Sequence, residues 1–166
     1  VHGLLQTEDY ARALIGADNP HASAEATERR VALRMRRQEL LARKAPPRVW
    51  VVMDETVLRW PVGGPEVMRA QIDHLLEVNR LPHVTVQLMP FSNGPHPALR
   101  AGAYHLFRFR ARELPDVVYL NGLVGAVYLD KADDVVVYRE ALDRLGAQAA
   151  PARKTEALLG AIRKEL

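Results

Sequence analysis

Two adjacent carboxylates, Asp54 and Glu55, are the side chains best placed for acid–base chemistry in this 166-residue chain. They follow the apolar run of residues 49–53, which predicts a strand, and ligands of open sheets often bind where strands end. Such a pair could transfer protons or hold a metal ion. The alternative, which we favour, is a solvated strand end whose Glu55 starts a turn, because no other residue with metal-ligand spacing lies nearby.

His96 is the second candidate for chemistry. It lies between Pro95 and Pro97, whose rings restrict the backbone in a way that suits a binding histidine, although a loop histidine held by ordinary hydrogen bonds is the alternative. The sequence contains no phosphate-binding loop and no dinucleotide fingerprint. We therefore expect a protein that is not an enzyme and has no catalytic residue, cofactor or metal.

Arginines gather on one predicted helix. Seven of the 23 Lys and Arg residues fall within residues 29–44, beside a single acidic residue. At 100° per residue Arg30, Arg34 and Arg37 share one face, where guanidinium groups could meet phosphates or carboxylates of a partner. The alternative is a helix whose arginine stems pack while their heads stay in water. We expect an interface or structural ion pairs in preference to direct DNA contact, because no interleaved aromatic residues or groove-reading motif accompany the charge.

Composition indicates one globular domain. Hydrophobic residues make up 48% of the chain and charged residues 26%, and the length suits a single core. No segment approaches the roughly 18 apolar residues that a membrane-spanning helix requires. The absence of cysteine excludes disulfides and thiolate nucleophiles and fits a cytoplasmic protein. The net charge of +3 does not by itself indicate nucleic-acid binding.

The elements that position these residues are helices at both ends of the chain and strands in the middle. Thr7 and Ser23 are good N-cap residues, and no Gly or Pro interrupts the run after Ser23 before Pro46. The expected helices cover residues 7–15, 24–44, a stretch that begins at Pro65 and two stretches that follow Asp133 and Pro151.

Strand signals lie between these helices. The run over residues 48–54 suits a strand buried on both faces, and the helix from Pro65 connects it to an alternating strand at residues 84–89, so the two should be parallel. The segment YHLFRF and the pair VVYLNG and VGAVYLD, divided by Asn121 and Gly122, should be antiparallel.

These signals predict an α+β (mixed α/β) fold with one mixed sheet of about five strands packed with the N-terminal and C-terminal helices. We expect a single regulatory or partner-binding domain over residues 1–166. Its parts are N-terminal helices at 7–44, a sheet-containing core at 48–130 and C-terminal helices at 133–166.

An ordered set of motifs resembles a known family. The segments are VHGLLQTEDYARAL, RMRRQELL, VWVVMDETVLRWPVGGPEVMRAQIDHLLE, VTVQLMPFSNGPHPAL, VVYLNGLVGAVYLD and YREALDRL. In that order they resemble the C-terminal domain of the WhiJ-like regulators. These are antitoxin-like transcription factors of actinobacteria, in which an Xre-type helix-turn-helix precedes this domain of unknown function. The resemblance covers Val1 to about Leu145.

The resemblance implies that the DNA-binding domain lies upstream of Val1 and is absent from this chain. The chain itself would be a sensing, dimerising or partner-binding module. It would form a homodimer, and it could pair with a small companion protein or bind a small ligand. It would not associate with a membrane, and it would reach DNA only through the upstream domain. The family offers no catalytic residues. The candidates for ligand or partner binding are Arg30, Arg34, Arg37, Gln38, Asp54, Glu55 and His96.

Two other hypotheses stay open. One is a degenerate or unrecognised enzyme that uses Asp54, Glu55 and His96 on a nucleotide-like or other small ligand. The other is a plain dimerisation module.

Overall fold

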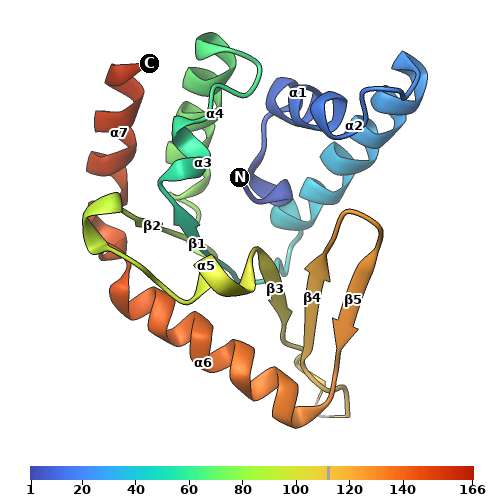
Figure 1. Cartoon of the computed structure of the whole chain (residues 1–166), viewed down its shortest axis with the longest axis vertical. Coiled ribbons are helices and arrows are strands. Elements are labelled where there is room, and N and C mark those ends of the chain that lie inside the picture. Colours follow the sequence, from blue (N-terminus) through green and yellow to red (C-terminus); the bar gives the residue numbers. More distant parts are fainter. Residues whose placement is uncertain (112) are drawn as a thin grey trace. The chain divides into compact units, whose positions relative to one another are not determined.

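The computed structural model describes residues 1–111 and 113–166. They form two compact units, residues 1–91 with 150–166 and residues 92–149 (Figure 1). In this described part the chain is mixed α and β with five strands, which confirms the predicted class. The strands make a two-stranded and a three-stranded sheet instead of the one mixed sheet that we expected.

The first unit contains the N-terminal helices, the parallel strands and the C-terminal helix. Its elements are η1 (Gly3–Leu5), α1 (Glu8–Asp18), α2 (Ala24–Gln38), η2 (Glu39–Ala42), β1 (Val49–Asp54), α3 (Thr56–Arg59), α4 (Pro65–Val78), β2 (Val84–Met89), η4 (Ala152–Lys154) and α7 (Thr155–Glu165).

Both predicted N-caps are confirmed. The Thr7 hydroxyl accepts a hydrogen bond from the Tyr10 N–H at 3.3 Å, and the Ser23 hydroxyl accepts one from the Ala26 N–H at 3.2 Å. Helix α2 ends at Gln38, six residues before the predicted end, and the chain continues as the 3₁₀ turn η2. Tightening into 3₁₀ geometry is a common way for a helix to satisfy its last carbonyl groups.

The strands β1 and β2 pair in parallel, as predicted, with Val49 opposite Val84. One face carries the buried core, in which β-strand side chains meet residues of α4 and α7. The expectation of a strand buried on both faces is wrong, because the Trp50 side chain is 41% exposed. Successive side chains alternate between faces, and Trp50 lies on the face opposite the core, where its Nε1 donates to Gln87 Oε1 at 2.7 Å.

The outer edge of β2 is closed by segments that are not strands. The Ala150 N–H donates to the Leu88 carbonyl at 2.8 Å, and the Thr155 hydroxyl donates to the Val86 carbonyl at 2.6 Å. The Val86 N–H donates to Asn79 Oδ1 at 3.0 Å. Among the described residues, these groups occupy the edge of β2 that a third strand would otherwise pair with.

The second unit contains α5 (Ala98–Ala101), β3 (Tyr104–Phe107), β4 (Val117–Asn121), β5 (Ala126–Leu129) and α6 (Ala132–Gln148), and η3 (Phe91–Asn93) leads into it. The strands are antiparallel, as predicted. The β4–β5 turn is longer than expected, with the Gly122 N–H bonded to the Gly125 carbonyl at 2.8 Å. Helix α6 packs on one sheet face, where the Tyr104 hydroxyl donates to the Tyr138 carbonyl at 3.1 Å and Val118 is fully buried.

Among residues 1–111 and 113–166, none of the helices combines the length and the apolar character needed to cross a bilayer.

A buried amide holds the start of the chain in place. The side chain of Gln71 on α4 is fully buried, its Oε1 accepts from the Thr7 N–H at 2.8 Å, and its Nε2 donates to the Leu5 carbonyl at 2.7 Å. These bonds satisfy the carbonyl of the buried Leu5 and the N–H of the partly buried Thr7.

Substitution of Gln71 by leucine should therefore lower the free energy of unfolding by about 2 to 4 kcal/mol, since the buried Leu5 carbonyl and the partly buried Thr7 N–H lose their partners. Urea unfolding followed by circular dichroism measures the change. The same substitution at the exposed Gln148 is the control and should cost less than about 0.5 kcal/mol. Equal costs for the two variants would contradict the role assigned to Gln71.

Candidate functional site

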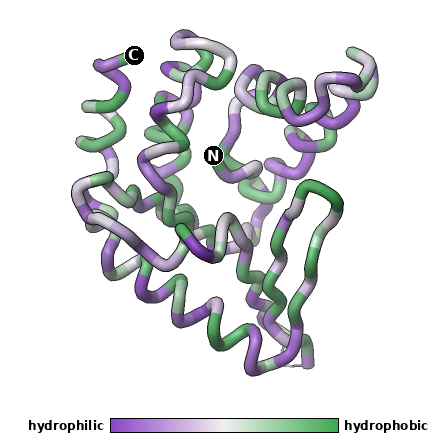
Figure 2. The backbone as a smooth tube through the Cα atoms, in the orientation of Figure 1, coloured by the Kyte–Doolittle hydropathy of each residue, from purple (hydrophilic) through white to green (hydrophobic). Residues whose placement is uncertain are grey.

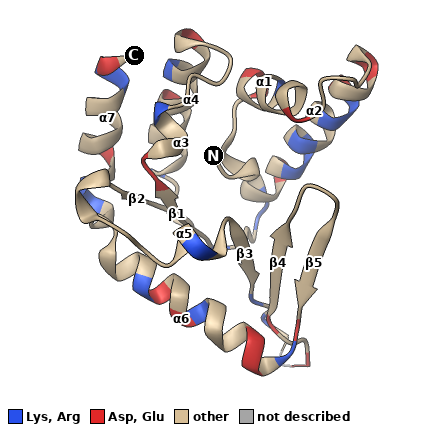
Figure 3. Ribbon diagram, in the orientation of Figure 1, with Lys and Arg blue, Asp and Glu red and all other residues tan. Residues whose placement is uncertain are grey.

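The predicted arginine row lies together on α2. Figure 3 shows basic residues repeating along this helix. Helix α2 packs beside α1, anchored by the buried side chains of Ile15 and Val31. Between the two helices lies a pocket of about 200 Å³. Its lining residues are Ile15, Asp18, Asn19, Arg30, Leu33, Arg34 and Arg37.

Acidic residues near the start of the same helices are already paired. Arg12 binds Glu8 and Asp9 on its own helix and Glu28 on α2, the last through Nε at 2.7 Å. Glu25 binds Arg29 at 2.5 Å. In the part of the chain that the structure describes, no carboxylate lies within 4.0 Å of the Arg30 or Arg37 guanidinium. Of the described residues, Asp18 is the one acidic residue that lines the pocket, beside three arginines.

Arg34 is the most constrained member of the row. Its Nη1 donates to Gln6 Oε1 at 2.9 Å, and the side chain is partly buried. Burial is the largest cause that lowers the pKa of Arg34, the Asp18 carboxylate opposes this, and the nearby charge of Arg37 lowers the pKa further. A bound anion would reduce this repulsion between Arg34 and Arg37.

Gln38, also a predicted candidate, has a structural role. Its Nε2 donates to the carbonyl of Gly3 at 3.0 Å and to that of Gln6 at 2.7 Å. Gln6 is itself buried and donates to the Val1 carbonyl at 2.7 Å. Side chains of α2 therefore hold residues 1–6, and Arg34 belongs both to this contact and to the pocket.

Asp54 and Glu55 lie at the end of β1, as predicted. Asp54 Oδ1 accepts hydrogen bonds from the Thr56 N–H at 2.7 Å and from the Thr56 hydroxyl. Glu55 Oε1 accepts from Arg59 Nη2 at 2.8 Å, and its Oε2 accepts from the Phe91 N–H at 3.2 Å. Both carboxylates thus stabilise the turn into α3, and the Glu55 side chain is only 15% exposed.

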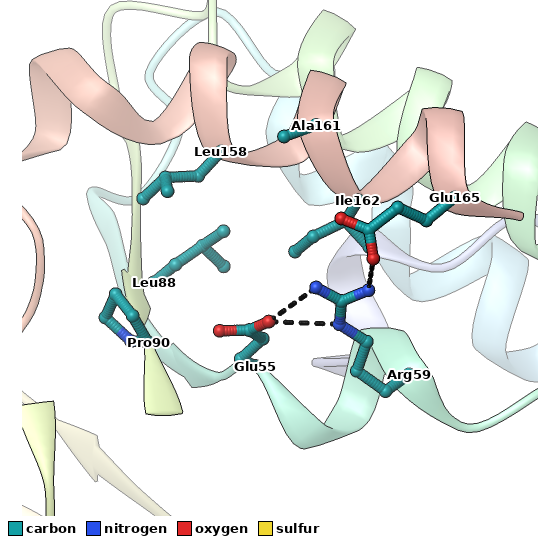
Figure 4. A pocket seen from close by; sticks show the side chains of 8 residues that line it. All are labelled: Glu55, Arg59, Leu88, Pro90, Leu158, Ala161, Ile162 and Glu165. Carbon is teal, nitrogen blue, oxygen red and sulfur yellow. Dashed lines mark hydrogen bonds and ion pairs between the residues drawn. The ribbon is translucent and has the colours of Figure 1, made fainter. Parts of the chain in front are cut away.

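Glu55 also borders a small pocket of about 90 Å³ (Figure 4). In it Arg59 bridges Glu55 and Glu165, so α3 is tied to α7. These two carboxylates are the first causes that raise the pKa of Arg59. The pocket is smaller than the several hundred Å³ of typical ligand sites. Its lining residues are Glu55, Arg59, Leu88, Pro90, Leu158, Ala161, Ile162 and Glu165.

His96 belongs to the second unit, where its carbonyl accepts a hydrogen bond from the Leu99 N–H at 3.1 Å. Asp54 and Glu55 belong to the first unit. Across the residues with described positions, no three His, Asp or Glu side chains converge in a way that could hold a metal ion.

An apolar hairpin in the second unit was not among the predicted sites. Leu123 and Val124 at its turn are fully exposed, and Val127 and Tyr128 on β5 are 53% and 68% exposed. Figure 2 shows the hydrophobic colour of this turn. The strand β5 lies at a sheet edge and carries no charged residue. The sequence shows two apolar residues, Leu123 and Val124, between Gly122 and Gly125, but it does not show that their side chains are exposed.

The structural role of Asp54 gives a prediction. Replacement by alanine should lower the free energy of unfolding by about 1 kcal/mol, because the Thr56 N–H loses its acceptor. Asparagine keeps an acceptor oxygen and should change it by less than about 0.5 kcal/mol. Urea unfolding of both variants measures the change. If the negative charge of Asp54 were required, and not only its acceptor oxygen, the two variants would lose equal free energy of unfolding.

Comparison with known proteins identifies the family of this chain. A family model described as "Domain of unknown function (DUF5753)" matches residues 1–161. Curated proteins and solved structures gave no match. The match to the family model covers nearly the whole length of the chain, including α1, α2 and the pocket between them. This chain therefore belongs to the DUF5753 family.

Proposed function

We propose that this chain is the regulatory domain of a cytoplasmic helix-turn-helix transcriptional regulator, similar to the antitoxin-like WhiJ regulators of actinobacteria. In this proposal the domain senses a ligand or a small companion protein. An Xre-type domain upstream of Val1 makes the contact with DNA. The ordered motifs that resemble those regulators support the proposal, as does membership of the DUF5753 family.

The observation that carries the proposal is the position of Arg34. It lines the pocket and also donates to Gln6, which in turn donates to the Val1 carbonyl. A partner that engages Arg34 would therefore act on the segment to which an upstream domain would attach. Coupling of this kind requires that binding favours one arrangement of the shared contact over another.

The enzyme alternative receives less support from the contacts. Asp54 and Glu55 accept hydrogen bonds from Thr56, Arg59 and Phe91, and these bonds account for their positions at the end of β1. A general base needs a carboxylate oxygen within reach of a substrate proton.

Substitution in the full-length protein separates the two functions. The R30A/R37A variant should change transcript levels of the regulated genes severalfold, because it removes positive charge from the pocket, whereas D54N/H96A should leave them unchanged. Quantitative RNA sequencing of cells that carry each variant measures this, with immunoblots to show equal protein levels. If only D54N/H96A altered transcription, the enzyme alternative would replace the regulatory one.

We also propose that the domain forms a homodimer through the apolar hairpin. An uncharged sheet edge exposes unpaired N–H and C=O groups, which are complementary to the same edge of a second copy. Large exposed apolar side chains beside such an edge are typical of interaction surfaces.

Light scattering on the purified chain should give the mass of a dimer, and L123S/V124S should shift it toward that of a monomer. The control L99S/L114S also removes two exposed leucines from the second unit and should leave the dimer intact. A monomer for the unmodified chain at all concentrations would refute the homodimer.

A further inference from the structure

We propose that the pocket between α1 and α2 binds a small oxyanion with more than one carboxylate or phosphate group, held by Arg30, Arg34 and Arg37. The pocket, its charge and the contact between Arg34 and Gln6 carry this inference. Its regulatory meaning rests on the proposed function, but the binding itself does not.

Charge favours an anion. Among the described residues, three guanidinium groups and one carboxylate, that of Asp18, line the pocket. Glu25 and Glu28, earlier on α2, are paired with Arg29 and Arg12. Guanidinium groups bind carboxylates and phosphates through two parallel N–H donors, which gives both strength and orientation.

Size and lining limit the class of anion. A volume of about 200 Å³ lies below the roughly 300–1,000 Å³ of sites for drug-sized ligands. Ile15 and Leu33 add apolar wall, and Asn19 Nδ2 already donates to the Ile15 carbonyl at 3.3 Å. These features suit a compact anion with several charged groups, such as pyrophosphate or citrate, more than a nucleotide.

Arg34 is already oriented before any ligand arrives. Its bond to Gln6 fixes one side of the guanidinium, and Arg30 and Arg37 lie one helical turn before and after it. Preorganised donors bind more tightly, because less side-chain freedom is lost on binding. An anion that also contacts Arg37 offsets the repulsion between Arg34 and Arg37, so it should reinforce the Arg34–Gln6 contact and protect residues 3–6 from amide exchange.

The test is isothermal titration calorimetry of the unmodified chain with pyrophosphate and, separately, with citrate, in about 0.15 M NaCl, where long-range charge effects are largely screened. We expect saturable binding of one anion per chain, weakened at least about tenfold in R30A/R37A. Arg30 and Arg37 are exposed, as are Arg36 and Arg43, but only the first two line the pocket. The control R36A/R43A therefore removes the same charge from the same segment without touching the pocket and should stay within about twofold. Thermal melts establish that each variant is folded.

Tighter binding of pyrophosphate would identify phosphate groups as the recognised chemistry, and tighter binding of citrate would identify carboxylates. The proposal is overturned if neither anion gives saturable heat, or if R36A/R43A loses as much affinity as R30A/R37A, because binding would then reflect general charge. These results are independent of the transcript measurement. Anion binding without a transcriptional effect of R30A/R37A would retain this site and refute the regulatory function.

Discussion

The first unit depends on one constraint, which is that the backbone of the first seven residues is packed against protein and must find its hydrogen bonds there. Gln71 supplies two of them from α4, and Gln38 supplies two from α2. Hydrogen bonds from side chains thus hold this segment, where a β-strand would be held by backbone hydrogen bonds to its neighbour. The side chains are those of Gln6, Gln38, Gln71 and Arg34. A buried backbone group left without a partner costs about 1–3 kcal/mol, so these bonds stabilise the arrangement of this segment.

The same constraint connects the fold with the candidate site. Arg34 completes the network by donating to Gln6, and it does so from the middle of a row whose other members face the pocket. Acidic residues of α1 and α2 are paired at the other end of the helices, which leaves the pocket with surplus positive charge. Arg34 therefore belongs both to a structural network and to an open pocket. A ligand bound in the pocket could act through Arg34 on the first residues of the chain.

Local signals in the sequence were strong enough to predict several of these elements. The caps at Thr7 and Ser23 and the parallel pairing of β1 with β2 follow from side-chain chemistry and connection length, and both were found. Helical spacing also placed Arg30, Arg34 and Arg37 together. The exposure of Trp50, the separate sheets and the contribution of Asp18 to the pocket could not be predicted, because each depends on which distant segment arrives beside it. The pairing of Glu55 with Arg59 had a readable signal in their spacing of four residues.

The closed edge of β2 has a consequence for how the protein is made. Residues 92–149 form an insertion whose two ends are brought together where Ala150 bonds to Leu88. Leu159 and Ile162, which complete the core, follow this insertion in the sequence. The core of the first unit can therefore be completed only after the whole insertion has been synthesised.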